Sequence, residues 1–291
     1  MSEPALKEVI FENKRRASID YRTNLSLAEE LSRVCQQGQT EQREATVAIR
    51  AEKPALFLFV SDPHLFSLYC DYPAFRQHME LVREHGVYVI TLGDLAPFFN
   101  PALGRAAAGV FHQVFTPEEQ AAAVKQWLVE LERAGLLLTV VNGNHEGFLE
   151  RVGVSFANSF LPDLAVPLLS SGGLLTLKVG EQIYRLALSH RFRGYSRLHP
   201  AQAARNLMFD LWPQADIAAV GHSHQKAIEM TEVGGSLRVW LVAGTYDIDN
   251  PYGRREGFGD PVLGGAGVAL WPKEKRLVPF WRLEEAIDVF I

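Results

Sequence analysis

Five short apolar runs in this chain each end in side chains that can bind a metal ion. The runs lie within 56–61, 87–92, 136–142, 184–189 and 216–221, and the polar side chains that follow them are Asp62 and His64, Asp94, Asn144 and His145, His190, and His222 and His224. Runs of this length predict buried β-strands. Because α/β sheets bind ligands outside the carboxyl ends of their strands, we expect these side chains to meet in one crevice.

The segments between the apolar runs predict helices over 74–85, 117–134 and 201–211. Thr116 stands as a capping residue before a proline at the first helical position. Strands alternate with helices in the first half of the chain, which favours parallel pairing. The second half adds closely spaced runs at 174–179, 237–243, 268–271 and 277–281, which favour a mixed sheet. The predicted class is a layered α/β domain.

Residues 1–53 differ in character from the rest of the chain, because they are charged and poor in glycine. Leu25, Leu27, Leu31 and Val34 follow roughly helical spacing, so we interpret 1–53 as an N-terminal helical arm and 54–291 as the catalytic domain. Basic and acidic side chains are equally frequent in the arm, which favours a solvated helix packed on the body over a nucleic-acid contact at residues 14–16.

Composition excludes several classes of protein. The chain has 291 residues, 47% hydrophobic and 22% charged, which rules out a disordered or disulfide-scaffolded protein. Its net charge of −5 argues against coating of nucleic acid over the whole surface. Cys35 and Cys70 form no pattern and are expected to be two thiols in a reducing compartment. The N-terminus has no signal-peptide core and no apolar run is long enough to span a membrane, so we expect a cytoplasmic protein without membrane contact.

The order of the polar blocks resembles that of the calcineurin-like metallophosphoesterase superfamily. The matching blocks are Asp62-x-His64, Gly93-Asp94, Gly143-Asn144-His145-Glu146, His190 and Gly221-His222-x-His224. The resemblance implies a four-layer α-β-β-α sandwich of two mixed sheets, with a dinuclear metal centre at the sheet ends. The stretches at 190–200 and 246–255 are similar to those of members encoded by bacteriophages.

The resemblance also implies a role for each residue of the site. Asp62, His64 and His224 would hold one metal ion, and Asn144, His190 and His222 would hold the other. Asp94 would bridge the two ions, and His145 would stabilise the transition state or protonate the leaving oxygen. This set of carboxylate, imidazole and amide ligands suits two divalent ions, with Mn first and Fe, Ni, Co or Zn as alternatives. A hydroxide shared by the two ions would attack phosphorus in line.

Several positions depart from the phosphoprotein phosphatase branch of this family. Leu65 replaces a glycine, Pro97 and Phe98 replace an aspartate and an arginine, and Gly147 and Phe148 stand where that branch has its second arginine. A protein phosphatase is therefore disfavoured, and the sequence shows no residue that orients His145. The insertion at 97–115 is rich in Phe and Ala and is expected to form a lid or a partner surface.

Four further side chains are candidates for contact with the substrate. Arg191, Arg193 and Tyr195 directly follow a predicted ligand, and His199 lies just beyond them. Arginine grips phosphate and aromatic rings stack on bases, so this loop favours a phosphodiesterase that acts on DNA or RNA in the manner of a nuclease. The alternatives are a phosphomonoesterase or a phosphodiesterase of small or cyclic nucleotides, and a binding module with a vestigial metal site. The sequence leaves the oligomeric state open.

Overall fold

The computed structural model describes residues 21–38, 42–196, 198–248 and 261–291. The chain divides into a unit that ends at Thr40 and a compact unit over Glu41–Ile291. The first unit contains helix α1 (Tyr21–Gly38), along which Tyr21, Leu25, Leu27 and Leu31 are exposed. The side chains of Val34 and Cys35 lie outside the described set.

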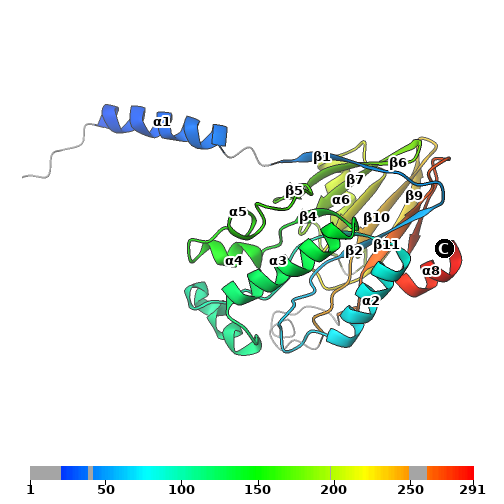
Figure 1. The fold of residues 1–291 in the computed structure, drawn as a ribbon. Helices are drawn as coiled ribbons and strands as arrows, with labels where there is room; N and C mark the ends of the chain where they lie inside the picture. The colour runs from blue at the N-terminus through cyan, green and yellow to red at the C-terminus, as the bar shows by residue number, and fades with distance from the viewer. Residues whose placement is uncertain (1–20, 39–41, 197, 249–260) are drawn as a thin grey trace, which may run out of the picture. The chain divides into compact units, whose positions relative to one another are not determined.

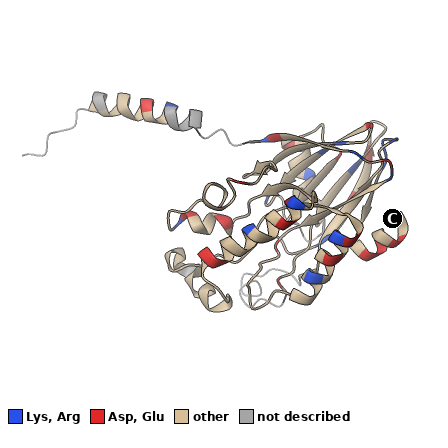
Figure 2. Ribbon diagram, in the orientation of Figure 1, with Lys and Arg blue, Asp and Glu red and all other residues tan. Residues whose placement is uncertain are grey.

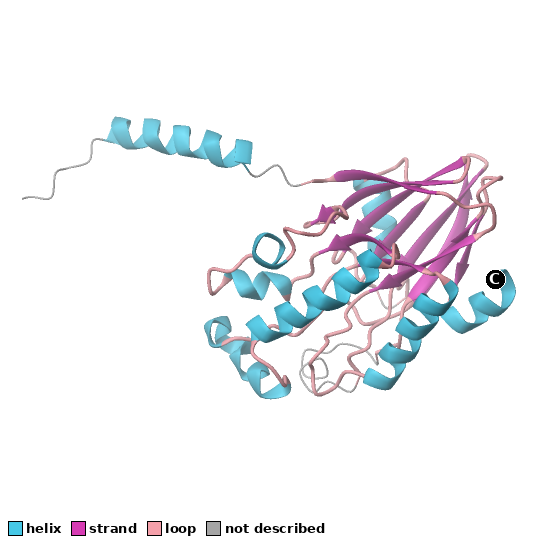
Figure 3. Cartoon of the chain, in the orientation of Figure 1, coloured by secondary structure: helices cyan, strands magenta, loops and turns pink. Residues whose placement is uncertain are grey.

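Two six-stranded sheets form the second unit (Figures 1 and 3). In spatial order, the strands of one sheet are β12 (Leu277–Phe280), β11 (Ala266–Leu270), β2 (Ala55–Val60), β3 (Tyr88–Thr91), β4 (Leu137–Val141) and β5 (Leu168–Leu169). Strands β2 to β5 pair in parallel, and β11 and β12 pair antiparallel. The parallel pairing predicted for the first half is confirmed.

The other sheet is also mixed, as expected for the second half of the chain. Its strands, in spatial order, are β1 (Glu44–Ile49), β6 (Gly173–Val179), β7 (Gln182–Ser189), β8 (Ile217–Val220), β10 (Ser236–Val242) and β9 (Ala227–Val233). Strand β7 is parallel to β8 and β8 is parallel to β10, so the carboxyl ends of β7 and β8 lie side by side.

Helices cover the outer face of each sheet and complete four layers. The helices that accompany the sheets are α2 (Tyr72–His85), α3 (Pro117–Arg133), α6 (Gln202–Leu211) and α8 (Leu283–Phe290), while η1 (Pro101–His112), α4 (Glu146–Glu150) and α5 (Phe156–Phe160) lie in the loops. Side chains of α2, α3 and α8 share one core with the β2 sheet, and α6 shares another with β7, β8 and β10. Figure 2 shows charged residues along α2, α3 and α8. The predicted α-β-β-α sandwich of two mixed sheets is confirmed.

The interior between the sheets explains why the two sheets hold together. Phe57 and Phe59 of β2 are fully buried and belong to the same apolar cluster as Leu177 of β6 and Val239 of β10. Alternate residues of β2, such as Leu58, instead face the helices α2 and α3. A strand buried on both faces reads as a continuous apolar run, which is the pattern that the sequence showed.

One part of the predicted arm is wrong. Residues 44–49, assigned above to a helical segment, form β1 and pair in parallel with β6 at the edge of a sheet. Buried or partly buried positions alternate with exposed ones along the strand, and Ala45 and Ile49 face the core while Glu44 faces solvent. Alternation over six residues is too short to be distinguished from helical spacing without knowledge of the neighbouring strand.

No helix among the described residues is long and apolar enough to cross a membrane.

The inter-sheet core gives a direct test of this architecture. We expect Phe59→Ala to lower the free energy of unfolding by about 3–5 kcal/mol, because it removes a buried ring and leaves a cavity between the sheets. Phe111→Ala is the matched control, since Phe111 is 79% exposed and its loss should change stability by less than about 0.5 kcal/mol. Urea denaturation of both variants measures the difference, and equal effects would contradict the assignment of Phe59 to the core.

Candidate metal centre

The predicted ligands lie on loops that leave the carboxyl ends of neighbouring strands. The loop after β2 runs beside the loop after β3, with backbone hydrogen bonds from Asp62 N to Gly93 O (3.0 Å) and from His64 N to Asp94 O (3.2 Å). The loops after β7 and β8 are joined in the same way, by Gly221 N to His190 O (2.9 Å). Strand pairing therefore continues past the strand ends and brings the ligand loops together.

Five of the candidate ligands have left-handed backbone conformations, which L-residues other than glycine seldom adopt. The φ angles are 49° at Asp62, 42° at His64, 53° at Asp94, 68° at His222 and 55° at His224. Such residues persist only where the surrounding structure imposes them, and they concentrate at functional sites. Among the described residues, the other non-glycine positions with positive φ are Phe66 and Phe98, so most of the strained positions are candidate ligands.

Glycines allow these loops to approach one another. A Cβ at Gly143 would collide with the carboxylate of Asp94, and a Cβ at Gly221 would collide with the hydroxyl of Ser61. Gly93 has a positive φ of 92° and packs directly against the backbone of Gly143. The glycine of each predicted block is thus required by close contact.

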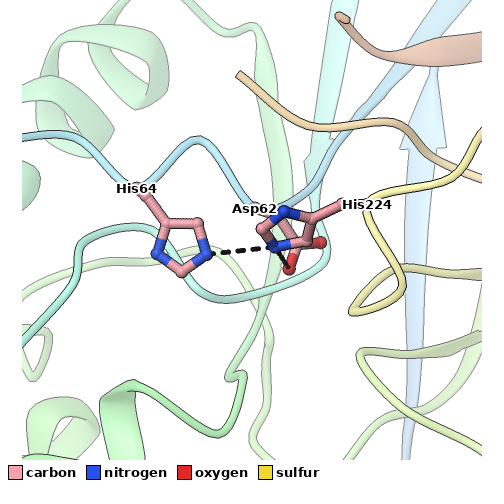
Figure 4. Close-up of side chains that lie close together, drawn as sticks. All are labelled: Asp62, His64 and His224. Carbon is pink, nitrogen blue, oxygen red and sulfur yellow. Dashed lines mark hydrogen bonds and ion pairs between the residues drawn. The ribbon is translucent and has the colours of Figure 1, made fainter. Parts of the chain in front are cut away.

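Asp62, His64 and His224 form the first ligand group (Figure 4). The Nε2 atoms of His64 and His224 lie 3.3 Å apart, and His224 Nε2 lies 3.3 Å from Asp62 Oδ1. Asp62 Oδ2 accepts hydrogen bonds from the Ser61 hydroxyl and from the His222 amide (2.8 Å), whereas no hydrogen bond from the described residues satisfies the buried Oδ1 atom. Such a buried carboxylate oxygen without a hydrogen bond, close to two imidazole nitrogens, fits a divalent cation.

Asp94, His190 and His222 form a second group. Asp94 Oδ2 lies 3.1 Å from His190 Nε2, and Asn144 Oδ1 lies 3.1 Å from the same nitrogen. The rings of His190 and His222 meet edge to face with centroids 5.1 Å apart. The four side chains that resemblance assigned to the second ion and its bridge therefore lie together.

Asp94 stands between the two groups. It also forms a ligand group with His64 and His145, and its Oδ1 accepts a hydrogen bond from the His145 amide (2.8 Å). Its other oxygen lies 3.8 Å from His145 Nε2 as well as close to His190. This central position is the one that a bridging carboxylate would need.

The pKa values of the histidines at the site are shifted in different directions. Burial, reinforced by the charge of His145, lowers the pKa of His64 to about 4. Burial and the charge of His190 lower the pKa of His222 to about 4 as well. Burial alone would also lower the pKa of His190, but the carboxylates of Asp94 and Asp62 raise it to about 10. The neutral rings of His64 and His222 are able to bind a metal ion. The proton on His190 balances part of the negative charge of Asp62 and Asp94, which a bound cation would otherwise balance.

Backbone carbonyls set the direction of two histidine rings. His190 Nδ1 lies 2.7 Å from Leu92 O, and His145 Nδ1 lies 2.7 Å from Pro97 O. A carbonyl can only accept, so each Nδ1 donates and each Nε2 is directed toward the site. The carbonyl of Pro97 thus orients His145 from the position where phosphoprotein phosphatases have an aspartate. A backbone atom leaves no signal in the residue type, so this partner could not be found from the sequence.

Glu146 joins the loops after β3 and β4. Its buried carboxylate accepts hydrogen bonds from the amides of Asp94 (3.0 Å), Leu95 (2.7 Å) and Gly143 (2.6 Å). Burial and the charge of Asp94 raise the pKa of Glu146 to about 7, although these hydrogen bonds favour the charged form. The sequence placed Glu146 in a block without a role, and the structure shows that it holds Asp94 in position.

Asp247 is a second buried carboxylate that the sequence analysis did not assign. It accepts a hydrogen bond from the hydroxyl of Ser67 (2.7 Å), and its charge acts to raise the pKa of both His64 and His224. It follows Thr245, whose hydroxyl donates to the carbonyl of Asp62. Its position in a loop far along the chain from the ligand blocks concealed this role.

The insertion at 97–115 contributes an aromatic wall. The rings of Phe99 and Phe148 contact His145, with centroid distances of 5.2 and 4.5 Å. Gln113 holds Phe99 in place through hydrogen bonds to its amide (3.0 Å) and carbonyl (2.9 Å). The insertion was expected to form a lid or a partner surface, and its residue Phe99 forms part of the wall of the site.

The candidate substrate contacts are placed differently from one another. Arg191, Arg193 and Tyr195 line a pocket of about 720 Å³ that includes His222. The Arg193 guanidinium is engaged by Asp210 at 2.8 and 3.1 Å, whereas His199 is exposed and is not part of the pocket lining. Arg191 and Tyr195 thus line the pocket beside His222, whereas Arg193 is paired with Asp210 and His199 lies outside the lining.

Comparisons of sequence find no protein-family model and no curated protein that matches the chain. Among solved structures, vacuolar protein sorting 29 from Cryptosporidium parvum is 14% identical with a TM-score of 0.40 and covers 78% of this chain and 97% of its own. A Thermus thermophilus protein, TT1561, is 14% identical with a TM-score of 0.37, covering 78% and 98%. A putative 5'-nucleotidase from Staphylococcus aureus is 14% identical with a TM-score of 0.40, covering 79% and 55%. Identities and TM-scores this low carry no argument about chemistry, which rests on the residues of the site.

Metal binding is tested by stability. We expect Mn²⁺ at a hundredfold excess over its Kd to stabilise the protein by about 2.7 kcal/mol, which raises the melting midpoint by roughly 5–10 °C. Asp62→Asn should abolish this shift because it removes a charged ligand. Asp163→Asn is the matched control, since Asp163 is exposed and pairs with Lys125, and it should keep the full shift. A shift that survives in Asp62→Asn would contradict the site.

Proposed function

We propose that this chain is a dinuclear metal-dependent phosphoesterase that hydrolyses phosphodiester bonds. The observation that carries the proposal is the overlap of three ligand groups, in which Asp94 belongs to two and His64 belongs to two. Separate single-ion sites would not share side chains in this way. The resemblance of the five sequence blocks to calcineurin-like metallophosphoesterases supports the same interpretation.

Two divalent ions bound at these ligands would supply Lewis acidity and an activated water for attack at phosphorus. The chain's own part is to place and compensate charge. Asp62 and Asp94 would hold the ions with two carboxylates, and Glu146 fixes Asp94 by accepting a hydrogen bond from its amide. His145, with Nδ1 fixed on Pro97 O, presents Nε2 for a proton transfer to the leaving oxygen.

The walls of the site favour a diester over a monoester. A phosphate monoester carries up to two negative charges at neutral pH, whereas a diester carries one. His145 contacts the rings of Phe99 and Phe148, and the phosphate-gripping arginines of the phosphatase branch are replaced by Phe98 and by the Gly147-Phe148 pair. Arg191, which lines the pocket beside His222, supplies one cation for a singly charged group. We further propose a nucleic acid or a nucleotide as the substrate, since Arg191 and Tyr195 can serve a phosphate and a base.

The first test compares two chromogenic substrates in Mn²⁺. We expect bis-p-nitrophenyl phosphate to be hydrolysed with a higher kcat/KM than p-nitrophenyl phosphate. Asp94→Asn should reduce the rate with either substrate to the background, because an amide can bridge two cations only poorly. Asp163→Asn again serves as control, and a preference for the monoester would favour a phosphomonoesterase. Absence of turnover in the metal-loaded wild type would favour a binding module.

The role of His145 has a separate test. We expect His145→Asn to lower kcat for bis-p-nitrophenyl phosphate by about 10²–10⁴-fold, the range for loss of a general acid. Its metal content should be unchanged if His145 serves proton transfer rather than ligation. His85→Asn is the control, since His85 is partly exposed on α2 and lies beside Glu84. Loss of bound metal in His145→Asn would show instead that this side chain is a ligand.

A further inference from the structure

The pocket beside the candidate metal centre lies between α6 and the carboxyl ends of β8 and β10. Val220 ends β8, Val242 ends β10, and both line the pocket together with Ala203 of α6. Gly221 and His222 follow Val220 directly, so one wall of the pocket is the ligand loop itself. A group bound in the pocket would therefore lie next to a phosphate held at the candidate metal centre.

The pocket combines apolar surface with a single kind of charge. Its walls include the rings of Phe192, Tyr195 and Pro200 over the small side chain of Ala203. Tyr195 is 57% exposed and Ala203 partly exposed, so an incoming planar group can reach both. Arg191 lies at the end nearest the centre, where its charge acts on His222. An apolar slot with aromatic walls and a cation at its mouth matches a heterocyclic ring attached to a phosphate.

The wall that carries Tyr195 is fixed to α6. Arg193 forms its ion pair with Asp210, and Asn206 donates a hydrogen bond to the Arg193 carbonyl (3.1 Å). Gln202 in turn donates to Asn206 (2.6 Å), and Gly194, with φ of 108°, passes so close to Asn206 that a Cβ would collide with it. The loop thus reaches the pocket as a formed wall, which lowers the entropic cost of ordering it on a ligand.

The size of the pocket is also informative. At about 720 Å³ it lies within the range of small-molecule sites. A phosphate alone needs far less space, and the apolar side chains of Phe192, Pro200 and Ala203 offer a phosphate no hydrogen-bond donor. The occupant must therefore extend from the phosphate as a larger, partly apolar group.

We propose that this pocket binds the nucleobase of a nucleotide whose phosphate lies at the metal centre, with Tyr195 stacking on the base and Arg191 holding the phosphate. This inference rests on the proposed function for the location of the phosphate. The base can come from a free nucleotide or from a single strand of nucleic acid, and the same chemistry recognises both.

The test is binding to the Mn²⁺-loaded full chain, measured by calorimetry with ligands that cannot be hydrolysed. One arm compares a nucleoside 5'-phosphonate with ribose 5-phosphonate, which lacks the base. The other arm compares a short single-stranded oligonucleotide phosphorothioate with its abasic analogue. We expect the base to lower Kd by about tenfold or more in at least one arm, as base stacking on an aromatic ring does. The arm that shows the effect identifies the source of the base.

Two variants locate the effect in this pocket. Ala203→Phe should fill the pocket, so that the ligand with a base and its analogue without one bind with nearly equal Kd values. The Kd of ribose 5-phosphonate should stay the same. Tyr195→Ala should remove part of the ratio. Ala122→Phe, on the exposed face of α3, is the matched control and should keep the full ratio. Melting curves show whether each variant is folded.

Equal Kd values with and without the base in both arms would overturn the proposal, as would a base effect that Ala203→Phe leaves intact. Hydrolysis of bis-p-nitrophenyl phosphate by the same preparations separates this outcome from failure of the proposed function. Turnover without a base effect contradicts the pocket alone. A base effect without turnover supports the pocket and contradicts the phosphoesterase.

Discussion

Two buried carboxylates determine how the rest of the site is built. Asp62 and Asp94 are almost completely shielded from water, and each lies within about 3.3 Å of an imidazole nitrogen. Buried charge is costly unless it is paired. The nearby protonated His190 supplies one compensating charge, while the low pKa values of His64 and His222 leave those rings neutral and able to bind a cation. The negative charge and the neutral ligands are thus arranged for divalent metal ions.

The scaffold holds these groups at the cost of backbone strain. Each left-handed residue destabilises the chain by about 1–3 kcal/mol, and the loops keep this conformation because they are joined to one another. Glu146 joins Asp94 to Gly143, and the amide of His222 donates to Asp62, so carboxylates on one loop bind the backbone of the next. The sandwich provides the rigid base for this network, since its sheets share an apolar interior and place the carboxyl ends of their parallel strands at the same edge.

The two flanks of the centre differ in a way that bears on the substrate. On the side of His145 the walls are the rings of Phe99 and Phe148, which offer little to a doubly charged phosphate. On the side of His222 the pocket carries Arg191 and Tyr195 above an apolar floor. The substrate proposed above, with one phosphate charge and an attached planar group, would contact both of these walls. The proposed preference for a diester and the proposed base pocket both follow from this difference between the walls beside His145 and beside His222.

The sequence by itself determined the fold class and the positions of the ligand blocks, because both depend on local pattern. Apolar runs such as 56–60 predict strands wherever they occur, and a polar residue at the end of a parallel strand can reach only one edge of the sheet. The tertiary structure alone decided the roles of partners that carry no local signal. These include the pairing of β1 with β6, the carbonyl of Pro97 that orients His145, and the capture of Arg193 by Asp210 instead of substrate. Each depends on which distant segment lies opposite, and neither spacing nor residue type records that.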